Sequence, residues 1–563
     1  MTPSKFIVSK QFWITFFVVL MIFARNLNPF DSLTFVGHDE TQAARISEFS
    51  FNIQNGVLPP RIAPHFSFNL GYPIFNYYAP FAYWITSFIH IAGVPVPQSL
   101  EISYMFALIV GLFGIYRFLK YFFGRLSGFI GSIAYISSPF IAVDIFVRSN
   151  LAEMWFFALF PLALSYITTT KKKNVFPTAL ILSALFTSHN IFSLISIPII
   201  LMYVAIIKNR YAWVAAIGGI ILSSYFWLPA LGELAQVHAS RVATLTEYSD
   251  HFLCPMQLWS SPWGYAGSAP GCVLDGMSFM VGKVQLFFAG VGISLFIIKL
   301  LKKKYEKRDV LIASVGLLLF ASIFSTTESS LFLWKMFEPV LSLFQFPWRF
   351  LLFVIFGLAF FTAYFLSVQP RIVRIISAGV ILIMIIFLNA KFFKPQDLQI
   401  QNYTNSYLSK AYISNIAAFK VPEYVPSSVD FTYWKNLEKQ NALISEFDTL
   451  VVPTASHQGK IEVLNHSSFS SKIEIQTDSP IVLNIHSAHY WNIQIDGKKY
   501  EPKKVDKLGR PIISFHDQDT HIVEITYRQT NIQKVANTLT VLIGIILLLY
   551  SYPNLVWKIN KKH

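Results

Sequence analysis

Residues 151–173 read LAEMWFFALFPLALSYITTTKKK, an apolar stretch that ends in three consecutive lysines. The apolar part, 151–168, contains one charged side chain, Glu153, and approaches the length of about 20 residues that a helix needs to cross a bilayer. Basic turns next to such helices are typical of the cytoplasmic side of a membrane. The segment therefore predicts a membrane-spanning helix followed by a cytoplasmic turn.

The composition of the whole chain is that of a membrane protein. Among its 563 residues, 54% are hydrophobic and only 13% are charged, whereas soluble domains carry about 25% charged residues. The aromatic share of 16% suits lipid-facing helices and interfacial belts. Twelve apolar stretches predict spanning helices, at residues 11–26, 101–119, 126–143, 151–168, 175–188, 191–207, 211–229, 279–298, 309–325, 347–367, 372–389 and 535–553.

The lysines and arginines that give the chain its net charge of +15 cluster in particular turns between these stretches. If the N-terminus is cytoplasmic, every second turn faces the cytoplasm, and those turns hold the lysine and arginine clusters. Examples are Lys171–Lys173, Lys302–Lys304, and Arg371 with Arg374. This asymmetry is the positive-inside pattern. We therefore expect a multi-pass protein of the cell (plasma) membrane with cytoplasmic N- and C-termini, and no nucleic-acid partner.

The chain is predicted to have three parts. Residues 1–394 form a transmembrane domain with large external loops at 27–100 and 230–278. Residues 395–533 are polar and contain short alternating runs, which predict an extracytoplasmic β-rich domain, a β-sandwich of about 100 residues. Residues 534–563 hold the final transmembrane helix and a basic cytoplasmic tail. The predicted fold class is mainly α, a polytopic membrane bundle of about 12 spans with a β-sandwich domain before the last span.

The first external loop contains two segments that are apolar on at least one face. Residues 39–55 predict a short amphipathic helix. Residues 77–91 could pass as a thirteenth span, but a span here would place Arg117, Lys120 and Arg125 outside. The charge rule therefore predicts that 77–91 is an interfacial or re-entrant helix.

Both cysteines of the chain, Cys254 and Cys272, fall in the external loop 230–278. Disulfides persist outside the cytoplasm. We favour a disulfide between them, and two unrelated thiols are the alternative.

The densest polar group at a predicted membrane boundary is His38, Asp39 and Glu40, with Gln42 close behind. Two adjacent acids beside a histidine can deprotonate a hydroxyl or hold a divalent metal ion. The alternative is structural, because Asp39 followed by Gln42 three residues later fits a helix N-cap with a capping-box partner. Both roles can coexist, since a capped first turn would hold the carboxylate rigidly.

A second polar group comprises Asp144, Arg148 and Glu153, in the short turn between two predicted spans. Charges near a membrane need a partner or a function, so either an interfacial salt bridge or a phosphate-binding arginine is open. His189 and Arg349 lie at other external boundaries, and a guanidinium matches the geometry of a lipid phosphate. All these groups fall on the predicted external side, where they could converge on one site.

The order of these features resembles the GT-C superfamily of integral-membrane glycosyltransferases. Asp39-Glu40 stands where that family places its catalytic acid. The stretch Ala79-Pro80-Phe81-Ala82-Tyr83-Trp84 looks like the family's juxtamembrane helix, and Phe122-Phe123-Gly124-Arg125 looks like the basic turn after its second span.

More narrowly, the chain resembles YfhO-like proteins and the bacterial membrane proteins labelled "6-pyruvoyl-tetrahydropterin synthase-related". The motifs that carry this resemblance are Gly71-Tyr72-Pro73, Tyr77-Tyr78-Ala79-Pro80, Arg148 through Glu153, Phe346-Pro347-Trp348-Arg349 and Pro422-Glu423-Tyr424-Val425-Pro426. No HxH pattern in a soluble α/β context accompanies them, so pterin synthesis is not expected.

The resemblance implies a fold, an activity and partners. The donor would be a polyprenyl-phosphate-linked sugar, the acceptor a cell-envelope glycan or lipid, and the sugar would be inverted at its anomeric carbon. Asp39, with Glu40 beside it, would act as catalytic base. Arg148 and Arg349, or a metal held by Asp39, Glu40 and His38, would neutralise the leaving phosphate, with Asp144, Glu153 and His189 in supporting positions.

Two other functions are compatible with the sequence. One is a transporter or flippase of a lipid-linked sugar, and the other is a non-catalytic membrane scaffold. A transporter would be expected to carry charges or broken helices deep in its spans, whereas the polar groups here gather at the external ends. We therefore favour the enzyme.

Overall fold

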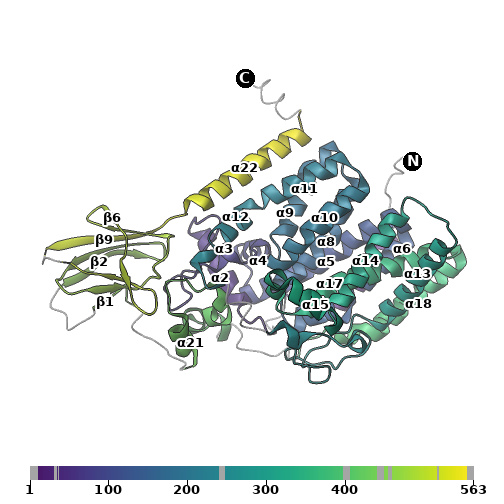
Figure 1. Ribbon diagram of the computed structural model, residues 1–563, viewed down its shortest axis with the longest axis horizontal. Coiled ribbons are helices and arrows are strands. Elements are labelled where there is room, and N and C mark those ends of the chain that lie inside the picture. The colour runs from purple at the N-terminus through teal and green to yellow at the C-terminus, as the bar shows by residue number, and fades with distance from the viewer. Residues whose placement is uncertain are drawn as a thin grey trace.

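The computed structural model describes residues 10–30, 35, 37–239, 247–396, 406–439, 449–453, 460–515 and 519–553. It consists of a large helical body and a small β region at one end (Figure 1). The mainly helical fold and the C-terminal β region that the sequence predicts are confirmed.

Each of the twelve predicted apolar stretches coincides with a helix of the body. Seven helices are long and apolar enough to cross a membrane, or up to nine if each of two bent pairs is one span. The count of twelve therefore stays a prediction. The helices are α1 (Lys10–Ala24), α5 (Val96–Phe123), α6 (Arg125–Ile136), α8 (Leu151–Thr169), α9 (Val175–Phe186), α10 (Asn190–Ile207), α11 (Arg210–Leu222), α13 (Lys283–Leu301), α14 (Asp309–Ser325), α17 (Leu351–Ser367), α18 (Arg371–Asn389) and α22 (Asn531–Ser551).

One of the bent pairs has a clear cause in the sequence. Helix α6 is followed by α7 (Pro139–Ala142) and the π-helical turn η1 (Val143–Val147), and the chain bends by 46° between them. Proline has no N–H to donate and disfavours helical backbone in the residue before it, and Ser138 accordingly has ψ of 132°. The second pair, α11 and α12 (Ser224–Gly232), is bent by 52°. These breaks lie toward the side opposite the basic turns.

The first external loop folds into α2 (Gln42–Gln54), α3 (Ile74–Tyr77) and α4 (Phe81–Ile91). A short helix forms here as predicted, but it is buried on its polar side too: Arg45 and Glu48 are buried, as are Ala43 and Phe49. The 11 residues of α4 extend about 16 Å, roughly half the thickness of a bilayer core. Their length fits the prediction that residues 77–91 do not span.

The remaining helical segments are short turns. One, η2 (Lys172–Asn174), forms the basic turn after α8. The others are η3 (Leu234–Gln236), η5 (Tyr248–His251), η6 (Pro255–Leu258), η7 (Glu328–Ser330), α15 (Leu331–Met336), α16 (Glu338–Leu341), η8 (Ser342–Phe344), η9 (Pro347–Phe350), η10 (Ala390–Phe392), α20 (Lys410–Asn415), η11 (Ala417–Lys420), η12 (Pro422–Tyr424) and α21 (Phe431–Lys439).

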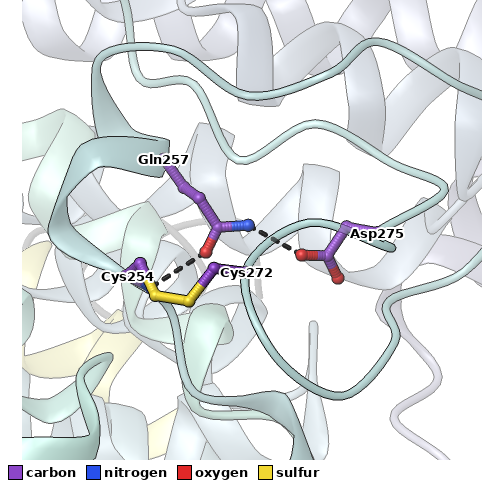
Figure 2. The surroundings of a disulfide bond; sticks show 4 residues. All are labelled: Cys254, Gln257, Cys272 and Asp275. Atoms are coloured by element: carbon purple, nitrogen blue, oxygen red, sulfur yellow. Dashed lines mark hydrogen bonds between the residues drawn. A yellow bond between two sulfur atoms is a disulfide. The ribbon is translucent and has the colours of Figure 1, made fainter.

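A disulfide closes part of the predicted second external loop near η6. Cys254 and Cys272 form a disulfide with their Cα atoms 5.8 Å apart. Figure 2 shows how Gln257 links the two sides: Cys254 N donates to its Oε1 at 2.8 Å, and its Nε2 donates to Asp275 Oδ2 at 2.7 Å. The loop is thereby fixed at a position from which it reaches the first external loop.

The β region consists of two antiparallel sheets. The first has the order β1 (Val451–Pro453), β4 (Ile481–Leu483), β8 (Pro511–Ile513), β7 (Lys504–Val505). The second has the order β2 (Lys460–Ser467), β3 (Ser470–Gln476), β9 (Thr520–Tyr527), β5 (Trp491–Ile495), β6 (Lys498–Tyr500). Apolar side chains of both sheets, such as Ile473 and Leu483, share one core. Asp496 and Gly497, a dipeptide typical of hairpin turns, both have positive φ and connect β5 to β6 in an antiparallel pair.

A buried polar network joins the β region and α22 to the helical body. At its centre, Glu233 Oε2 accepts from Asn76 Nδ2 at 2.8 Å and from Gln533 Nε2 at 3.0 Å. The Thr530 hydroxyl, which caps α22, donates to Glu233 Oε1, and His489 Nε2 lies 3.5 Å from that atom. We call this group the Glu233 joint. It connects the first external loop, α12, the β region and the last span, which runs along α11 and α12 in Figure 1.

Candidate functional site

A cluster of charged residues lies where three apolar helices begin. Helices α8, α10 and α17 all start next to it, and each runs from there to a basic turn at its other end, near Lys171, Lys208 and Arg371. The cluster is thus on the side opposite the basic turns, as the sequence predicts for the candidate site.

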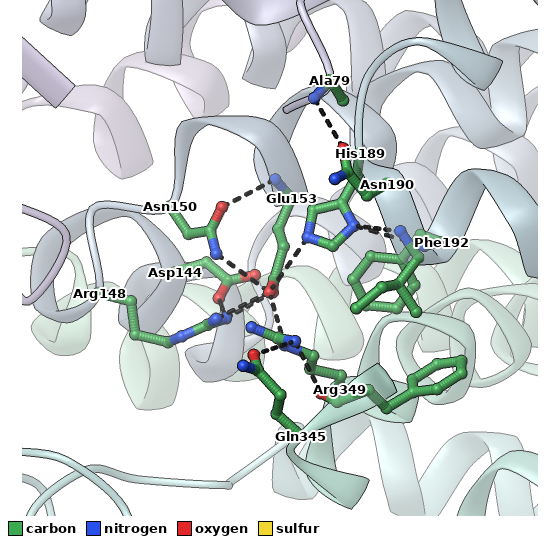
Figure 3. A network of polar contacts seen from close by, with 12 residues as sticks. Ala79, Asp144, Arg148, Asn150, Glu153, His189, Asn190, Phe192, Gln345 and Arg349 are labelled. Carbon is green, nitrogen blue, oxygen red and sulfur yellow. Dashed lines mark hydrogen bonds and ion pairs between the residues drawn. The ribbon is translucent and has the colours of Figure 1, made fainter. Parts of the chain in front are cut away.

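Glu153, in the first turn of α8, is the centre of the cluster (Figure 3). Its carboxylate is completely buried and accepts hydrogen bonds from Arg148, with Nη2 2.7 Å from Oε1. Asn150, the N-cap of α8, donates from Nδ2 to the same oxygen at 3.0 Å. Arg148 also pairs with the buried Asp144 of η1, and its guanidinium lies over the Trp348 ring, 4.5 Å from the centroid.

Arg349 approaches Glu153 from the opposite side. Its Nε lies 3.2 Å from Glu153 Oε1, and its Nη1 donates to Phe344 O at 2.7 Å and to Gln345 Oε1 at 3.3 Å. The Arg349 side chain is 11% exposed. Two guanidinium groups therefore face two carboxylates, Glu153 and Asp144, in a largely buried volume.

His189 completes the cluster as the N-cap of α10. Its Nδ1 accepts from the backbone N–H groups of Ile191 and Phe192 at 3.3 and 3.4 Å, which leaves the ring proton on Nε2. That Nε2 lies 3.8 Å from Glu153 Oε1. Burial lowers the pKa of His189 to about 3, against the opposing effect of Glu153. His189 is therefore a neutral donor at physiological pH.

The Asp39 loop is attached to this cluster by its backbone. His38 N donates to Val147 O at 3.0 Å and Asp39 N donates to Arg148 O at 2.9 Å. The close approach depends on Gly37, because a Cβ there would lie 2.7 Å from Val147 O and would collide with the Ser149 side chain. Asp39 and Arg148, far apart in the sequence, are therefore neighbours.

The Asp39 carboxylate is held by side chains rather than by the helix backbone. Oδ1 accepts from the Thr41 hydroxyl at 3.0 Å and pairs with Arg45 Nη2 at 3.2 Å, and Oδ2 accepts from Gln42 Nε2 at 2.5 Å. The N-cap of α2 is Thr41. The capping-box interpretation of Asp39 is therefore wrong, because the helix begins two residues later than that motif requires.

The neighbours of Asp39 turn to different partners. Glu40 pairs with Lys420 at 3.0 Å, and His38 Nε2 contacts Tyr265 O of the disulfide-linked loop at 3.0 Å. Within the described part of the chain, no group of three or more His, Cys, Asp and Glu side chains is arranged to hold a metal ion. The three residues proposed for a metal do not form such a centre here, and a divalent ion stays a prediction.

Four residues of this site were not recognised as site residues in the sequence. Arg45 of α2 is completely buried, donates to the Tyr83 hydroxyl at 3.0 Å and lies over the Tyr78 ring. Burial raises the pKa of Tyr78 to about 12, and both Asp39 and Arg349 act on it electrostatically. Burial raises the pKa of Glu423 in η12, and the charges of Arg45, Asp39 and Arg349 also affect it. The sequence motifs Tyr77-Tyr78 and Pro422 to Pro426 are recognisable, but neither indicates that the two segments meet at one site.

The structure brings most of the predicted site residues together. Backbone pairing, ion pairs and electrostatic contacts connect Asp39, Asp144, Arg148, Glu153, His189 and Arg349. Glu40 and His38 lie at the edge, directed elsewhere. The chemical roles assigned to these residues stay predictions.

A polytopic helical bundle with a charged cluster at the helix ends opposite the basic turns, and with an attached β region, defines an integral membrane protein. The family model "6-pyruvoyl-tetrahydropterin synthase related domain; membrane protein" matches residues 75–394, more than half of the chain. The chain therefore belongs to this family, as its motifs suggested. No protein in the curated collection that was compared matches the chain.

Solved structures of two membrane enzymes are similar to the chain. One is ArnT from Cupriavidus metallidurans bound to undecaprenyl phosphate, at 13% identity over 66% of this chain and 64% of that one, with a TM-score of 0.39. The other is the Archaeoglobus fulgidus oligosaccharyltransferase in the apo form, at 13% identity over 69% and 56%, with a TM-score of 0.41. The chain thus spans less than two thirds of either protein.

Proposed function

We propose that this protein is a membrane glycosyltransferase that moves a sugar from a polyprenyl-phosphate donor to a cell-envelope glycan or lipid at the outer membrane face. The observation that carries the proposal is the pair of buried arginines, Arg148 and Arg349, gathered around Glu153 where three apolar helices begin. Such a position suits a ligand with an anionic head and a long apolar tail.

The phosphate would bind to the Arg349 side of the cluster. Helix N-termini carry partial positive charge and unpaired N–H groups, which stabilise anions. The starts of α8, α10 and α17 meet here, and the neutral His189 adds an Nε2–H donor. Glu153 fixes both guanidiniums, so that they need no reorganisation when charge develops on the leaving phosphate.

The acceptor would enter from the Asp39 side. Its hydroxyl oxygen attacks the anomeric carbon and its proton passes to the Asp39 carboxylate. At the same time the bond from that carbon to the phosphate oxygen breaks, and the electron pair leaves with the polyprenyl phosphate. Direct displacement of this kind inverts the anomeric centre. Because Asp39 is joined to Arg148 through the backbone, the acceptor and donor sides are held at a fixed spacing.

The experiment that tests this function is sugar transfer from labelled polyprenyl-phosphate sugars in membranes containing equal amounts of each variant. We expect Arg349→Gln to weaken donor use and Asp39→Asn to lower transfer at least about 100-fold, as removal of a positioned catalytic or orienting group does. Arg371→Gln, an exposed arginine at the basic end of the bundle, is the matched control and should transfer like the wild type. Undiminished transfer by Asp39→Asn would remove Asp39 from the mechanism.

A second measurement separates the enzyme from a flippase. Purified protein in liposomes is tested for transbilayer movement of a labelled lipid-linked sugar without acceptor. Movement at a rate that Asp39→Asn leaves unchanged, together with no transfer, would favour a transporter over the proposed enzyme.

A further inference from the structure

A serine, a histidine and a glutamate are joined by hydrogen bonds where the β region meets the first external loop. Glu48 of α2 accepts from the backbone N–H of His65 at 2.9 Å through Oε2, and its Oε1 lies 2.8 Å from the ring Nδ1. On the other side of the ring, Nε2 lies 3.1 Å from Ser468 Oγ, in the turn between β2 and β3. Nucleophile, base and orienting acid in this order are the arrangement that activates a serine.

The Glu48 carboxylate determines where the His65 ring carries its proton. A carboxylate has only lone pairs to offer, so the contact at Nδ1 requires the proton on that nitrogen. In the neutral ring, Nε2 then has a lone pair, which faces the Ser468 hydroxyl at hydrogen-bond distance. A hydrogen bond that only docks the β region on α2 would not require the ring to be held at Nδ1 and at the backbone N–H together.

The three side chains differ in burial in the way that a surface catalytic site requires. The Glu48 side chain is 3% exposed and that of His65 is 37% exposed, while Ser468 is half-buried. The rings of Phe51 and Phe469 stack beside them, and the Phe51 ring meets the His65 ring edge to face at 4.8 Å. The acid is therefore shielded from water, whereas the base and the nucleophile are open beside an apolar surface.

Backbone donors are available next to the nucleophile. Among the described residues, the N–H groups of Ser468 and Phe469 have no hydrogen-bond partner. The turn itself is held in place, because Phe469 O accepts from Tyr527 N at 2.8 Å. Backbone N–H groups at and beside a nucleophilic serine are the donors that stabilise the oxyanion of acyl transfer.

We propose that Ser468 and His65, oriented by Glu48, form a second catalytic site that hydrolyses a carboxylic ester with an apolar acyl group. Ser468 Oγ attacks the ester carbonyl carbon and its proton passes to His65 Nε2. The bond from that carbon to the alcohol oxygen then breaks, and the alcohol leaves with the proton from Nε2. Water attacks the acylated serine by the same route, which releases the carboxylic acid and returns the proton to Ser468.

The first test uses a fluorophosphonate, a reagent that phosphonylates activated serines, on the full-length protein in detergent. Peptide mass spectrometry locates the label. We expect it on Ser468 of the folded wild type and not on the heat-denatured protein. Ser470→Ala is the matched control, because Ser470 is exposed on the same hairpin and pairs with Ser467 rather than with the histidine. This variant should be labelled like the wild type.

The second test measures rates in variants of the three residues. We expect His65→Gln to lower the rate of labelling about 100-fold or more, because it removes the base. Hydrolysis of p-nitrophenyl butyrate should fall in parallel and should be lost in Ser468→Ala. Labelling of the wild type requires no variant, so the proposal stays testable if His65→Gln does not fold.

The pH profile of labelling tests Glu48 as a positioning residue. Labelling requires neutral His65, so its rate should rise as the pH passes the pKa of this residue. The charged and titratable groups that face His65 are Glu48 of α2, Lys410 of α20 and His466 of β2. Glu48 raises the pKa of His65, so Glu48→Gln should label slowly and with its midpoint at lower pH. Glu48→Asp, which keeps a carboxylate, should recover part of the rate.

Four results would overturn the proposal. These are a folded wild type without label on Ser468, equal labelling of wild type and His65→Gln, a midpoint that Glu48→Gln does not move, and ester hydrolysis that Ser468→Ala leaves unchanged. Because the site is separate from the Glu153 cluster, each result is independent of whether the protein transfers sugar.

Discussion

The protein has two buried polar networks centred on a glutamate, and they are built differently. Around Glu233, the closest donors are the amides of Asn76 and Gln533 and the hydroxyl of Thr530. Around Glu153, Arg148 and the Asn150 amide donate hydrogen bonds, Arg349 forms an ion pair, and a neutral histidine lies nearby. The Glu233 network contains mostly uncharged donors, whereas the Glu153 network pairs carboxylates with guanidinium groups.

The difference indicates what each network is for. The amides and hydroxyl around Glu233 join the end of α12 to α3 and to the start of α22, which supplies both Thr530 and Gln533. The Glu153 cluster joins segments too, but it buries two arginines and leaves Asp144 Oδ2 without a hydrogen-bond partner in the described part of the chain. Buried charge in a membrane protein is costly, and it marks a functional position more often than a structural one.

The largest effect is expected from Glu153→Gln. Removing this carboxylate leaves Arg148 and Arg349 with Asp144 alone, and breaking a buried ion pair costs about 3–5 kcal/mol. We expect a lower unfolding temperature in detergent and loss of sugar transfer. Thermal unfolding and the transfer assay measure the two effects on the same preparation. A Glu153→Gln protein as stable and active as the wild type would contradict the view that this charge organises the site.

Gly37→Ala is expected to have the next largest effect. The new Cβ would collide with Ser149 and lie 2.7 Å from Val147 O, and overpacking of this kind costs about 1–3 kcal/mol. We expect the Asp39 loop to move from Arg148 and transfer to fall, with little loss at the Glu233 joint. Gly379→Ala, which meets no atom within 4 Å, is the matched control. Equal transfer by both variants would show that the backbone pairing of Asp39 with Arg148 is unimportant.

The sequence predicted the bundle and its polar face because both depend on local chemistry. Apolar length is read residue by residue, so the helices from α5 to α22 follow from it, whereas the interfacial position of 77–91 stays a prediction. Asp39, Arg148 and Arg349 could be nominated because charge is rare at these boundaries. The sequence does not show that Gly37 allows the Asp39 loop to pair with Val147 and Arg148, because this pairing depends on how closely two distant segments approach each other in the fold.

The residues that the sequence did not reveal share a physical reason. Arg45 lies within a predicted amphipathic helix, where a charge is ordinarily taken as solvent-facing, yet its side chain is buried against Tyr78 and Tyr83. Glu423 lies in η12 and is distant in sequence from every helix of the site. The Asp144–Arg148 pair, by contrast, has the i, i+4 spacing of neighbours on one helix face and could be anticipated from the sequence.

A smaller effect is expected from Glu233→Gln, the same substitution made at the other network. The amide keeps one oxygen that can accept from Asn76 and Gln533, so we expect a loss of about 1 kcal/mol, the scale of one ordinary hydrogen bond. Transfer per folded molecule should be unchanged. Thermal unfolding of Glu153→Gln and Glu233→Gln in parallel compares the two networks directly. If Glu233→Gln lowers the unfolding temperature as much as Glu153→Gln does, the Glu233 joint also depends on charge.

The smallest effect is expected at a contact between the β region and α2, where His65 lies between Glu48 and Ser468. Its Nδ1 is 2.8 Å from Glu48 Oε1 and its Nε2 is 3.1 Å from Ser468 Oγ. Burial lowers the pKa of His65, but the hydrogen bond and charge of Glu48 raise it further, so the net shift is upward. A raised pKa means that the protonated form favours folding: the contribution is complete below the ordinary value near 6.5 and is lost as the pH rises through the folded-state value.

We therefore expect limited proteolysis of the β region to become faster between about pH 6 and pH 8 in the wild type. In His65→Gln, the rate should depend less on pH. Because the His65 side chain is 37% exposed, solvent screens the pair and the change should be modest. His521→Gln, which removes a histidine paired with Asp496 inside the β region, is the control and should leave the pH dependence of docking in place. A pH profile that His65→Gln does not alter would assign this contact to packing alone, since the rings of Phe51 and Phe469 stack beside it.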